Sequence, residues 1–424
     1  MMLQRLYTIV CLTLLIILTG SCNEQPEPSE SALPTAQTQE FRYLGDGLGD
    51  DDPYNNPAAV TAGVFSPDGK WAFTGDVDGV VRLWDVETGK EIRRYGDVGH
   101  EDSNRADELV DELGVIGRVV SSPDGRFVLA GGGGVRAWHV DTGEEAWRAD
   151  GYGILSMRFS PDGMRVLVTC RNGCAKLLDA ATGRELLRLE GYKSDGTTEL
   201  DDNPYNHYVW DAAFSPDGLR VLTAEQDGHA GCARLWDVAS GQELRRFDHE
   251  REVTNCAFLS NGAQVLTISG YGAAQLWDVE SGAEITDRPW TGRAGWYRLS
   301  PDRSRILIIR SEEISPGRDE TGYLFAASLW DIYSDRKLSE FVSPTFSGHY
   351  TFSCDGNRVL TFDWHRCAED RSLRLWDVYT GKVIRTLDGH TWQVAGAVFS
   401  PEGKHVLSFE KDSGIAIIWA TSEQ

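Results

Sequence analysis

FSPDGK (65–70) is the stretch that decides the fold, because variants of it recur along the rest of the chain. The variants are SSPDGR (121–126), FSPDGM (159–164), FSPDGL (214–219), FLSNGA (258–263), LSPDRS (299–304), FSCDGN (352–357) and FSPEGK (399–404). Each copy is followed by an apolar run and then by a Trp-Asp pair or a relative of it. A unit repeated eight times predicts an architecture in which each copy packs against its neighbours.

The local pattern of each repeat predicts β structure. Short runs rich in β-branched and aromatic residues are separated by Pro-Asp-Gly, Asp-Gly or Thr-Gly turns, which is typical of antiparallel strands joined by hairpins. One small sheet cannot bury both of its faces, so the units must stack around an axis. We expect the recurring tryptophans to supply buried area between units and to be structural: Trp84, Trp138, Trp236, Trp277, Trp330, Trp376 and Trp419.

The phased Trp-Asp pairs and turns resemble the WD-repeat β-propeller family over residues 40–424. The resemblance implies a single all-β domain, an eight-bladed β-propeller of four-stranded antiparallel blades. Seven blades is the alternative if the degenerate sixth repeat is mis-phased. In the last repeat, the resemblance implies a structural hydrogen-bonded set formed by His390, Ser408, Asp412 and Trp419.

The two ends of the repeat region predict how the ring closes. The last repeat offers three strands, near 394–399, 404–409 and 414–419, and lacks a fourth. QEFRYLGDG (39–47) matches the fourth-strand segment KEIRRYGD (90–97) but has no preceding strands of its own. We therefore predict that the strand around Phe41 to Leu44 completes the last blade, which removes an open edge.

The first 22 residues have the features of an export signal. The apolar run from Leu6 to Leu18 is too short to span a bilayer and suits a signal peptide. Leu18-Thr19-Gly20-Ser21-Cys22 resembles the lipobox of bacterial lipoproteins, which implies lipid attachment at Cys22; an ordinary cleaved signal and an uncleaved anchor are the alternatives. Asn23 then implies the outer membrane of a Gram-negative cell envelope. Residues 23–39 are rich in Pro and Glu and are expected to form a disordered tether.

The net charge of −24, from 41 basic and 65 acidic residues, argues against binding to nucleic acid or to anionic membrane surfaces. Insertions occur before repeats 2 and 4 and between the second and third strands of repeats 6 and 7. In antiparallel blades these connections share one rim. Segments 45–60, 96–117, 190–208 and 311–324, here called the acidic face, contain 20 acidic residues and three basic ones.

Three interpretations of the acidic face remain open. It is a solvated surface, a docking surface for a protein with a basic surface, or a Ca²⁺ site, although no EF-hand loop is present. Its candidate partner-binding residues are Asp50, Asp51, Asp52, Tyr54, Asp201, Asp202, Tyr205, Tyr208 and Trp210. No other cofactor is indicated.

Catalytic motifs such as H-E-x-x-H, G-x-S-x-G and a phosphate-binding loop are absent from the sequence, so we expect no enzymatic activity. Cys170 and Cys174 flank a predicted hairpin turn, where a disulfide is sterically conceivable and free thiols are the alternative. The sequence predicts a monomeric, membrane-tethered, extracytoplasmic scaffold for protein–protein interaction. The competing hypothesis is a metal-dependent ligand-binding or enzymatic propeller that uses the mouth of the central channel.

Overall fold

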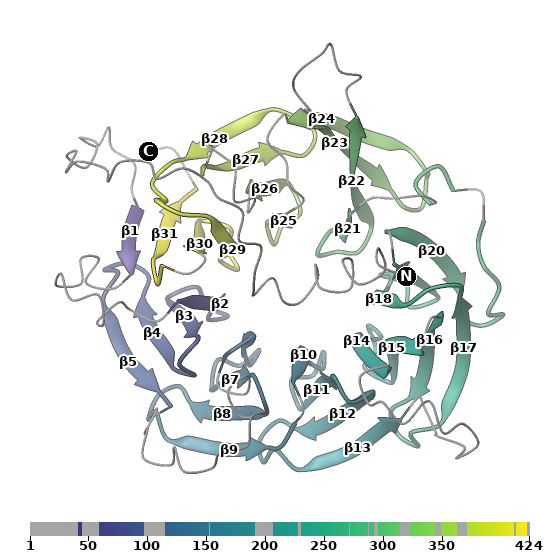
Figure 1. The fold of residues 1–424 in the computed structure, drawn as a ribbon, viewed down its shortest axis with the longest axis horizontal. Coiled ribbons are helices and arrows are strands. Elements are labelled where there is room, and N and C mark those ends of the chain that lie inside the picture. The colour runs from purple at the N-terminus through teal and green to yellow at the C-terminus, as the bar shows by residue number, and fades with distance from the viewer. Residues whose placement is uncertain are drawn as a thin grey trace, which may run out of the picture. The chain divides into compact units, whose positions relative to one another are not determined.

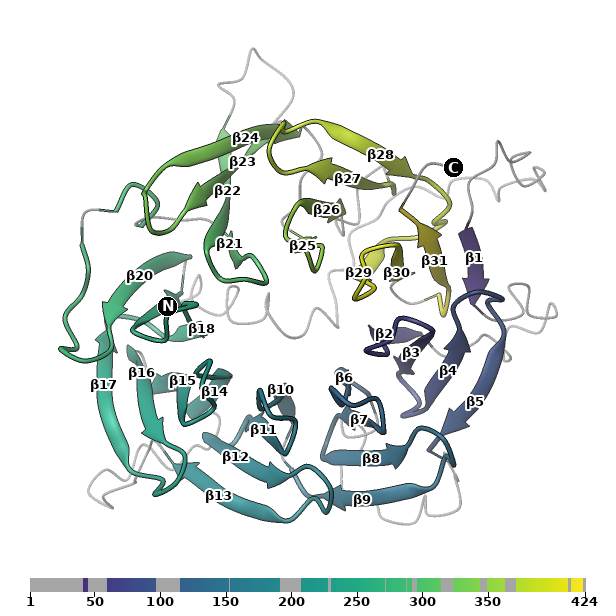
Figure 2. The same cartoon turned by 180° about the vertical axis from the view of Figure 1, so that it is seen from behind.

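Eight antiparallel sheets stand around a common axis and form the blades of a β-propeller (Figures 1 and 2). The computed structural model describes residues 41–44, 59–96, 115–151, 153–190, 207–227, 230–270, 272–286, 288–291, 296–313, 323–343, 349–362, 371–410 and 413–421. The chain divides into two compact units, Met1–Gln39 and Glu40–Gln424, and the second contains every described strand.

Within each blade the chain runs from the innermost strand to the outermost, so consecutive strands are neighbours. Blade 1 contains β2 (Val60–Phe65), β3 (Trp71–Asp76), β4 (Val81–Asp85) and β5 (Glu91–Tyr95), and blade 2 contains β6 (Arg118–Ser121), β7 (Phe127–Gly131), β8 (Val135–His139) and β9 (Glu145–Ala149). Blade 3 contains β10 (Ile154–Phe159), β11 (Arg165–Cys170), β12 (Cys174–Asp179) and β13 (Glu185–Glu190). Blade 4 contains β14 (His207–Phe214), β15 (Arg220–Asp227), β16 (Ala230–Asp237) and β17 (Glu243–His249).

Blades 5 to 8 continue in the same way. Blade 5 contains β18 (Val253–Phe258), β19 (Gln264–Ser269) and β20 (Ala273–Asp278), and blade 6 contains β21 (Trp296–Leu299), β22 (Arg305–Glu313), β23 (Tyr323–Asp331) and β24 (Lys337–Ser343). Blade 7 contains β25 (His349–Phe352), β26 (Arg358–Phe362), β27 (Leu373–Asp377) and β28 (Val383–Leu387). Blade 8 contains β29 (Val394–Phe399), β30 (His405–Glu410) and β31 (Ala416–Ala420), with β1 (Phe41–Leu44) as its outer strand.

The N-terminal strand closes the ring. β1 pairs antiparallel with β31, with Phe41 opposite Trp419 and Leu44 opposite Ala416. The prediction of eight blades with an N-terminal closing strand is confirmed, and the seven-bladed alternative is wrong. The sixth repeat forms its own four-stranded sheet although its turns have lost two glycines.

Blade 5 differs from the others within the described residues. Its sheet has three strands, and the position of the fourth is occupied by a single bridge between Trp277 and Glu284. The chain then leaves the sheet and buries Trp290 completely, in an apolar cluster that includes Leu276 of blade 5 and Ile306 of blade 6. Burial of a large aromatic ring replaces part of the missing strand pairing.

The hydrophobic core lies between blades rather than within one sheet. One cluster joins Leu360 and Leu375 of blade 7 to Val406 and Trp419 of blade 8. The next joins Leu407 of blade 8 to residues of blade 1 such as Trp84. Each blade is therefore held by its two neighbours, as expected for a repeat that cannot bury its own faces.

Candidate functional site

The acidic face lies mostly outside the described residues. Its connections join strands at the rim where the fourth strand of one blade leads to the first strand of the next. Residues predicted to bind a partner there that lie outside the described ranges are Asp50, Asp51, Asp52, Tyr54, Asp201, Asp202 and Tyr205. Tyr208 and Trp210 are described, and they mark the place where the chain returns from the 190–206 insertion to blade 4.

Tyr208 and Trp210 form an aromatic pair on β14. Their ring centroids are 4.9 Å apart, and both side chains are partly exposed. Val209 pairs with Glu225 and Asp211 pairs with Ala224, so Trp210 is the extra residue of a β-bulge. Its indole N–H donates to Oε1 of Gln226 at 3.3 Å, which fixes the ring beside the strand. Partly exposed, ordered aromatic rings are the kind of surface on which protein interfaces are built.

Asp211, next to this pair, points into the structure. Its carboxylate is buried and accepts hydrogen bonds from Arg158 of blade 3 at 2.9 and 3.1 Å and from the Ser156 hydroxyl at 2.9 Å. The negative charge of Asp211 raises the pKa of Arg158. This ion pair joins β10 and β14, the inner strands of two neighbouring blades.

The hydrogen-bonded set in blade 8 is centred on Ser408. The Trp419 indole donates to Ser408 Oγ at 2.7 Å, and Nε2 of His390 lies 2.7 Å from the same oxygen. Nδ1 of His390 lies 3.1 Å from Oε1 of Glu410, so Glu410 is the acid of this set. Asp412, the acid expected from the sequence, lies outside the described residues.

Glu410 is fully buried and is held by several donors. Besides His390, the amides of Thr391 and Trp392 donate to it at 2.6 and 3.1 Å, and the Ser413 hydroxyl also donates to it. Burial acts to raise the pKa of Glu410, but the hydrogen bonds outweigh burial and the pKa is lowered. The charged form of this carboxylate is therefore part of the folded structure.

Two other blades contain the same arrangement with arginine in place of histidine. In blade 1, Trp84 donates to Thr74 at 2.8 Å, and Arg82 forms an ion pair with buried Asp76. The acid follows the Thr by two residues, as Glu410 follows Ser408. In blade 4, the corresponding residues are Thr223, Glu225, Arg234 and Trp236. An acid two residues after the second-strand hydroxyl is thus common to blades 1, 4 and 8, and this spacing in the sequence points to Glu410 rather than Asp412.

Six of the seven recurring tryptophans are buried, and Trp330 is partly buried. Those that donate to a second-strand hydroxyl are Trp84, Trp236, Trp277, Trp376 and Trp419, at 2.7–3.0 Å. Trp330 donates instead to Ser328 of its own strand at 3.0 Å, and Trp138 is buried with its ring 6.1 Å from that of Tyr95.

The aspartates of the Trp-Asp pairs form the turn between the third and fourth strands. Oδ1 of Asp85 accepts the amide and the hydroxyl of Thr88, both at 2.7 Å, and these bonds lower the pKa of Asp85. Asp377 is held in the same way by Thr380. These carboxylates are therefore engaged in the fold at every such turn.

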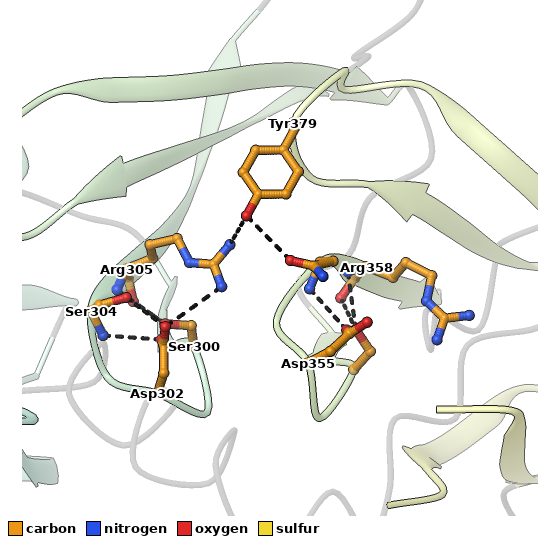
Figure 3. Close-up of polar contacts among 9 residues, drawn as sticks. Ser300, Asp302, Ser304, Arg305, Asp355, Arg358 and Tyr379 are labelled. Carbon is orange, nitrogen blue, oxygen red and sulfur yellow. Dashed lines mark hydrogen bonds and ion pairs between the residues drawn. The ribbon is translucent and has the colours of Figure 1, made fainter. Parts of the chain in front are cut away.

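The opposite rim is formed by the Ser-Pro-Asp-Gly turns (Figure 3). Arg305 of blade 6 and Asn357 of blade 7 are joined by Tyr379, whose hydroxyl accepts from Arg305 at 3.1 Å and donates to Asn357 Oδ1 at 3.2 Å. Beneath them, the Ser300 hydroxyl donates to Asp302 and accepts the amide of Arg305. Polar side chains of this rim thus connect neighbouring blades.

Cys170 and Cys174 are both buried and both are free thiols. Hydrogen bonding to Cys170, followed by burial, raises the pKa of Cys174. Across the described ranges, no group of three or more His, Cys, Asp or Glu side chains is arranged to hold a metal ion. No helix in the described part of the chain is long and apolar enough to cross a membrane.

Comparison with known proteins agrees with this architecture. The WD40 family model (WD domain, G-beta repeat) matches residues 54–85, 200–237 and 381–419. The WD repeat-containing protein 26 homolog of Arabidopsis thaliana is 24% identical over 84% of this chain, and the match covers 47% of that protein. The angio-associated migratory cell protein of Homo sapiens is 25% identical over 87% of this chain and 80% of its own length.

A guanine nucleotide-binding protein subunit beta of Zea mays is 25% identical over 52% of this chain, and the match covers 60% of the subunit. The chain thus spans between about half and four fifths of the relatives named here. Among solved structures, the computationally designed Ika8 protein matches with a TM-score of 0.61 and 22% identity, covering 86% of this chain and 96% of that one, a likeness of fold alone. This chain is therefore an eight-bladed β-propeller, three segments of which match the WD40 repeat model.

Proposed function

We propose that this protein is a membrane-tethered, extracytoplasmic scaffold that binds another protein through its acidic face. The observation that carries the proposal is the pair formed by Tyr208 and Trp210. It is ordered by the bond to Gln226 yet partly exposed, and it stands where an acidic insertion rejoins a rigid blade. WD-repeat propellers typically act as scaffolds for protein interaction, and loops on a rigid framework commonly carry binding residues.

Charge defines the kind of partner. The segments of the acidic face hold 20 acidic residues against Arg105, Lys193 and Arg318. A protein with a basic surface would be drawn toward such a face, and the attraction would be screened beyond about 10 Å at 0.1 M salt. The two aromatic rings would then supply apolar contact area at the centre of the interface.

Membrane attachment would come from Cys22, followed by the tether of residues 23–39. The combination would keep a rigid ring close to the membrane while leaving it free to reach a partner. The support for this part of the proposal is the sequence of residues 1–22, with its apolar run and its lipobox-like end.

The test is crosslinked affinity capture from intact cell envelopes, with identification of the proteins that co-purify. Two variants of the acidic face are compared with wild type: Tyr208→Ala, and the combined change of Asp50, Asp51, Asp52, Asp201 and Asp202 to Asn. Tyr379→Ala is the matched control, because Tyr379 is an exposed, hydrogen-bonded tyrosine of the opposite rim. We expect both acidic-face variants to lose the same captured protein and the control to retain it.

Raising the salt concentration should weaken the same capture. If wild type, both acidic-face variants and the control retain one partner equally at all salt concentrations, the acidic face is not the docking surface. If added calcium raises the thermal midpoint with the logarithm of its concentration, and the Asn variant loses that response, the face binds calcium instead.

A further inference from the structure

Three arginines extend from the innermost strands of the ring. Arg118 begins β6 in blade 2, Arg158 lies on β10 in blade 3, and Arg298 lies on β21 in blade 6. Blades 2 and 6 are opposite one another in the ring of eight, so these strands face each other across the axis (Figure 2). We call Arg118, Arg158 and Arg298 the arginine cluster.

The side chains of this cluster are accessible to water but surrounded by protein. All three residues are exposed, and half of the Arg158 side chain is accessible, at 50%. Arg118 is partly desolvated by the surrounding protein, and this desolvation lowers its pKa. The negative charge of Asp211 opposes the change, whereas the positive charges of Arg158 and Arg298 lower the pKa further. Arg118 and Arg298 are thus both exposed on inner strands that face each other across the axis.

The positive charge of the cluster exceeds the negative charge beside it. Arg158 is paired with Asp211, which is also bound to Ser156. The Arg118 guanidinium donates to the carbonyl of Gly117 at 2.9 Å. Within the described ranges neither Arg118 nor Arg298 forms an ion pair with a carboxylate. Among the described residues, three guanidinium groups and one carboxylate therefore leave an excess of positive charge here, in a protein whose net charge is −24, and such an excess attracts anions.

We propose that the arginine cluster binds a small anion that carries carboxylate or phosphate groups, with Arg118 and Arg298 holding it from opposite sides of the ring. A guanidinium presents a planar set of donors that matches both kinds of group. Two guanidiniums from opposed blades suit a ligand with at least two anionic groups. The site differs from the acidic face in the sign of its charge, and its ligand is a small anion rather than a protein.

The experiment measures binding to the full chain by calorimetry, together with thermal midpoints. The probes are citrate for carboxylates and pyrophosphate for phosphates, with sodium chloride at matched ionic strength as the reference. We expect one of the two probes to bind with one-to-one stoichiometry and to raise the thermal midpoint with the logarithm of its concentration. The probe that binds more tightly shows whether the site prefers carboxylate or phosphate groups.

Arg118→Gln and Arg298→Gln should each weaken binding by about tenfold or more, since each removes a charge-assisted contact. Arg118→Lys should have an intermediate effect because it keeps the charge and loses the planar set of donors. Arg148→Gln is the control: Arg148 is an exposed arginine of the outer strand β9 that pairs with Glu145, and its replacement should leave the affinity unchanged.

Thermal midpoints without the probe separate a binding role from a structural one. Removing one of the two unpaired charges relieves repulsion, so Arg118→Gln and Arg298→Gln should be at least as stable as wild type while losing the response to the anion. The proposal is overturned if neither probe binds at millimolar concentration. It is also overturned if Arg118→Gln and Arg148→Gln bind the probe equally well.

Discussion

The hydroxyl of Tyr43 donates a hydrogen bond to the carbonyl of Gly389 at 3.2 Å, across 346 residues of sequence. Tyr43 belongs to the closing strand β1, and Gly389 follows the outer strand of blade 7. There is no room for a side chain at Gly389, since a Cβ atom there would lie 2.9 Å from the Trp419 ring and 3.8 Å from the Tyr43 hydroxyl. Arg42 of the same strand reaches in the other direction, to the carbonyl of Val86 in blade 1, at 2.7 Å.

These contacts predict that the closing strand stabilises the whole ring. Deleting residues 38–46 removes β1, exposes the edge of β31 and returns Leu44, which is buried, to solvent. Loss of the Leu44 side chain from the core alone should lower the free energy of unfolding by about 2 kcal/mol. We therefore expect a clear drop in the thermal midpoint, measured by calorimetry.

Deletion of residues 23–36 is the matched control, because that segment precedes β1. It should leave the thermal midpoint unchanged. Equal midpoints for the two deletions would contradict a stabilising role for the closing strand.

The buried carboxylate of Glu410 predicts a pH dependence of stability. Its pKa is lowered from the ordinary value of 4.5, so the stability from its charged form is present above about pH 4.5 and is lost as the pH falls through the lower pKa of the folded protein. Glu410→Gln should lower the free energy of unfolding at pH 7 by about 2 kcal/mol, the scale of hydrogen bonds to a buried charge. The difference from wild type should shrink at pH 3.

The control for this comparison is Glu402→Gln, the same change at an exposed turn of blade 8. It should have little effect on unfolding by denaturant at either pH. If Glu410→Gln lowered the free energy of unfolding equally at pH 7 and pH 3, the charge of Glu410 would not be what stabilises the fold.

Two residues of blade 6 adopt a left-handed backbone conformation where other blades have glycine. Arg303 has φ 57° and Asp335 has φ 56°, whereas Gly69 and Gly89 occupy the matching positions of blade 1 at φ 70°. Arg303→Gly should raise the free energy of unfolding by about 1 kcal/mol, since the left-handed conformation is strained for residues with a Cβ. Thermal or denaturant unfolding would measure this gain.

Asp335→Gly should have the opposite effect despite relieving the same strain. Oδ1 of Asp335 accepts the indole N–H of fully buried Trp290 at 2.9 Å, and its other oxygen forms an ion pair with Arg288. Removing the Asp335 carboxylate would leave the buried Trp290 N–H without its acceptor, which should lower the free energy of unfolding by about 1–3 kcal/mol. If both substitutions stabilise the protein, the carboxylate of Asp335 does not anchor the segment that replaces the outer strand of blade 5.

Cys22→Ala should release the protein from the membrane into the soluble extracytoplasmic fraction, because the variant cannot receive a lipid at that position. Cys11→Ala, within the apolar run, is the matched control and should leave the protein in the membrane fraction. Fractionation followed by immunoblotting measures both. Membrane retention of the Cys22 variant with an uncleaved N-terminus would contradict the lipobox interpretation.

The phased repeats were sufficient to predict the number of blades and the closing strand. Each repeat has its own turn residues, such as Gly69, and its own tryptophan, and a blade contacts only its neighbours. A fold built from local, repeated contacts is therefore readable from spacing alone. The boundaries were less exact: β30 and β31 begin one and two residues later than the predicted strands.

The contacts between residues far apart in the sequence were decided by the tertiary structure. The sequence by itself indicated a buried acid near His390, but only packing shows that Glu410, at the end of a strand directed toward the imidazole, makes the contact. The placement of Arg118 and Arg298 depends on ring closure, because residues in blades 2 and 6 become opposed only when eight blades complete a circle. The spacing of turns and tryptophans within a repeat specifies a blade. The number of blades and the curvature of the ring decide which side chains face each other across the axis.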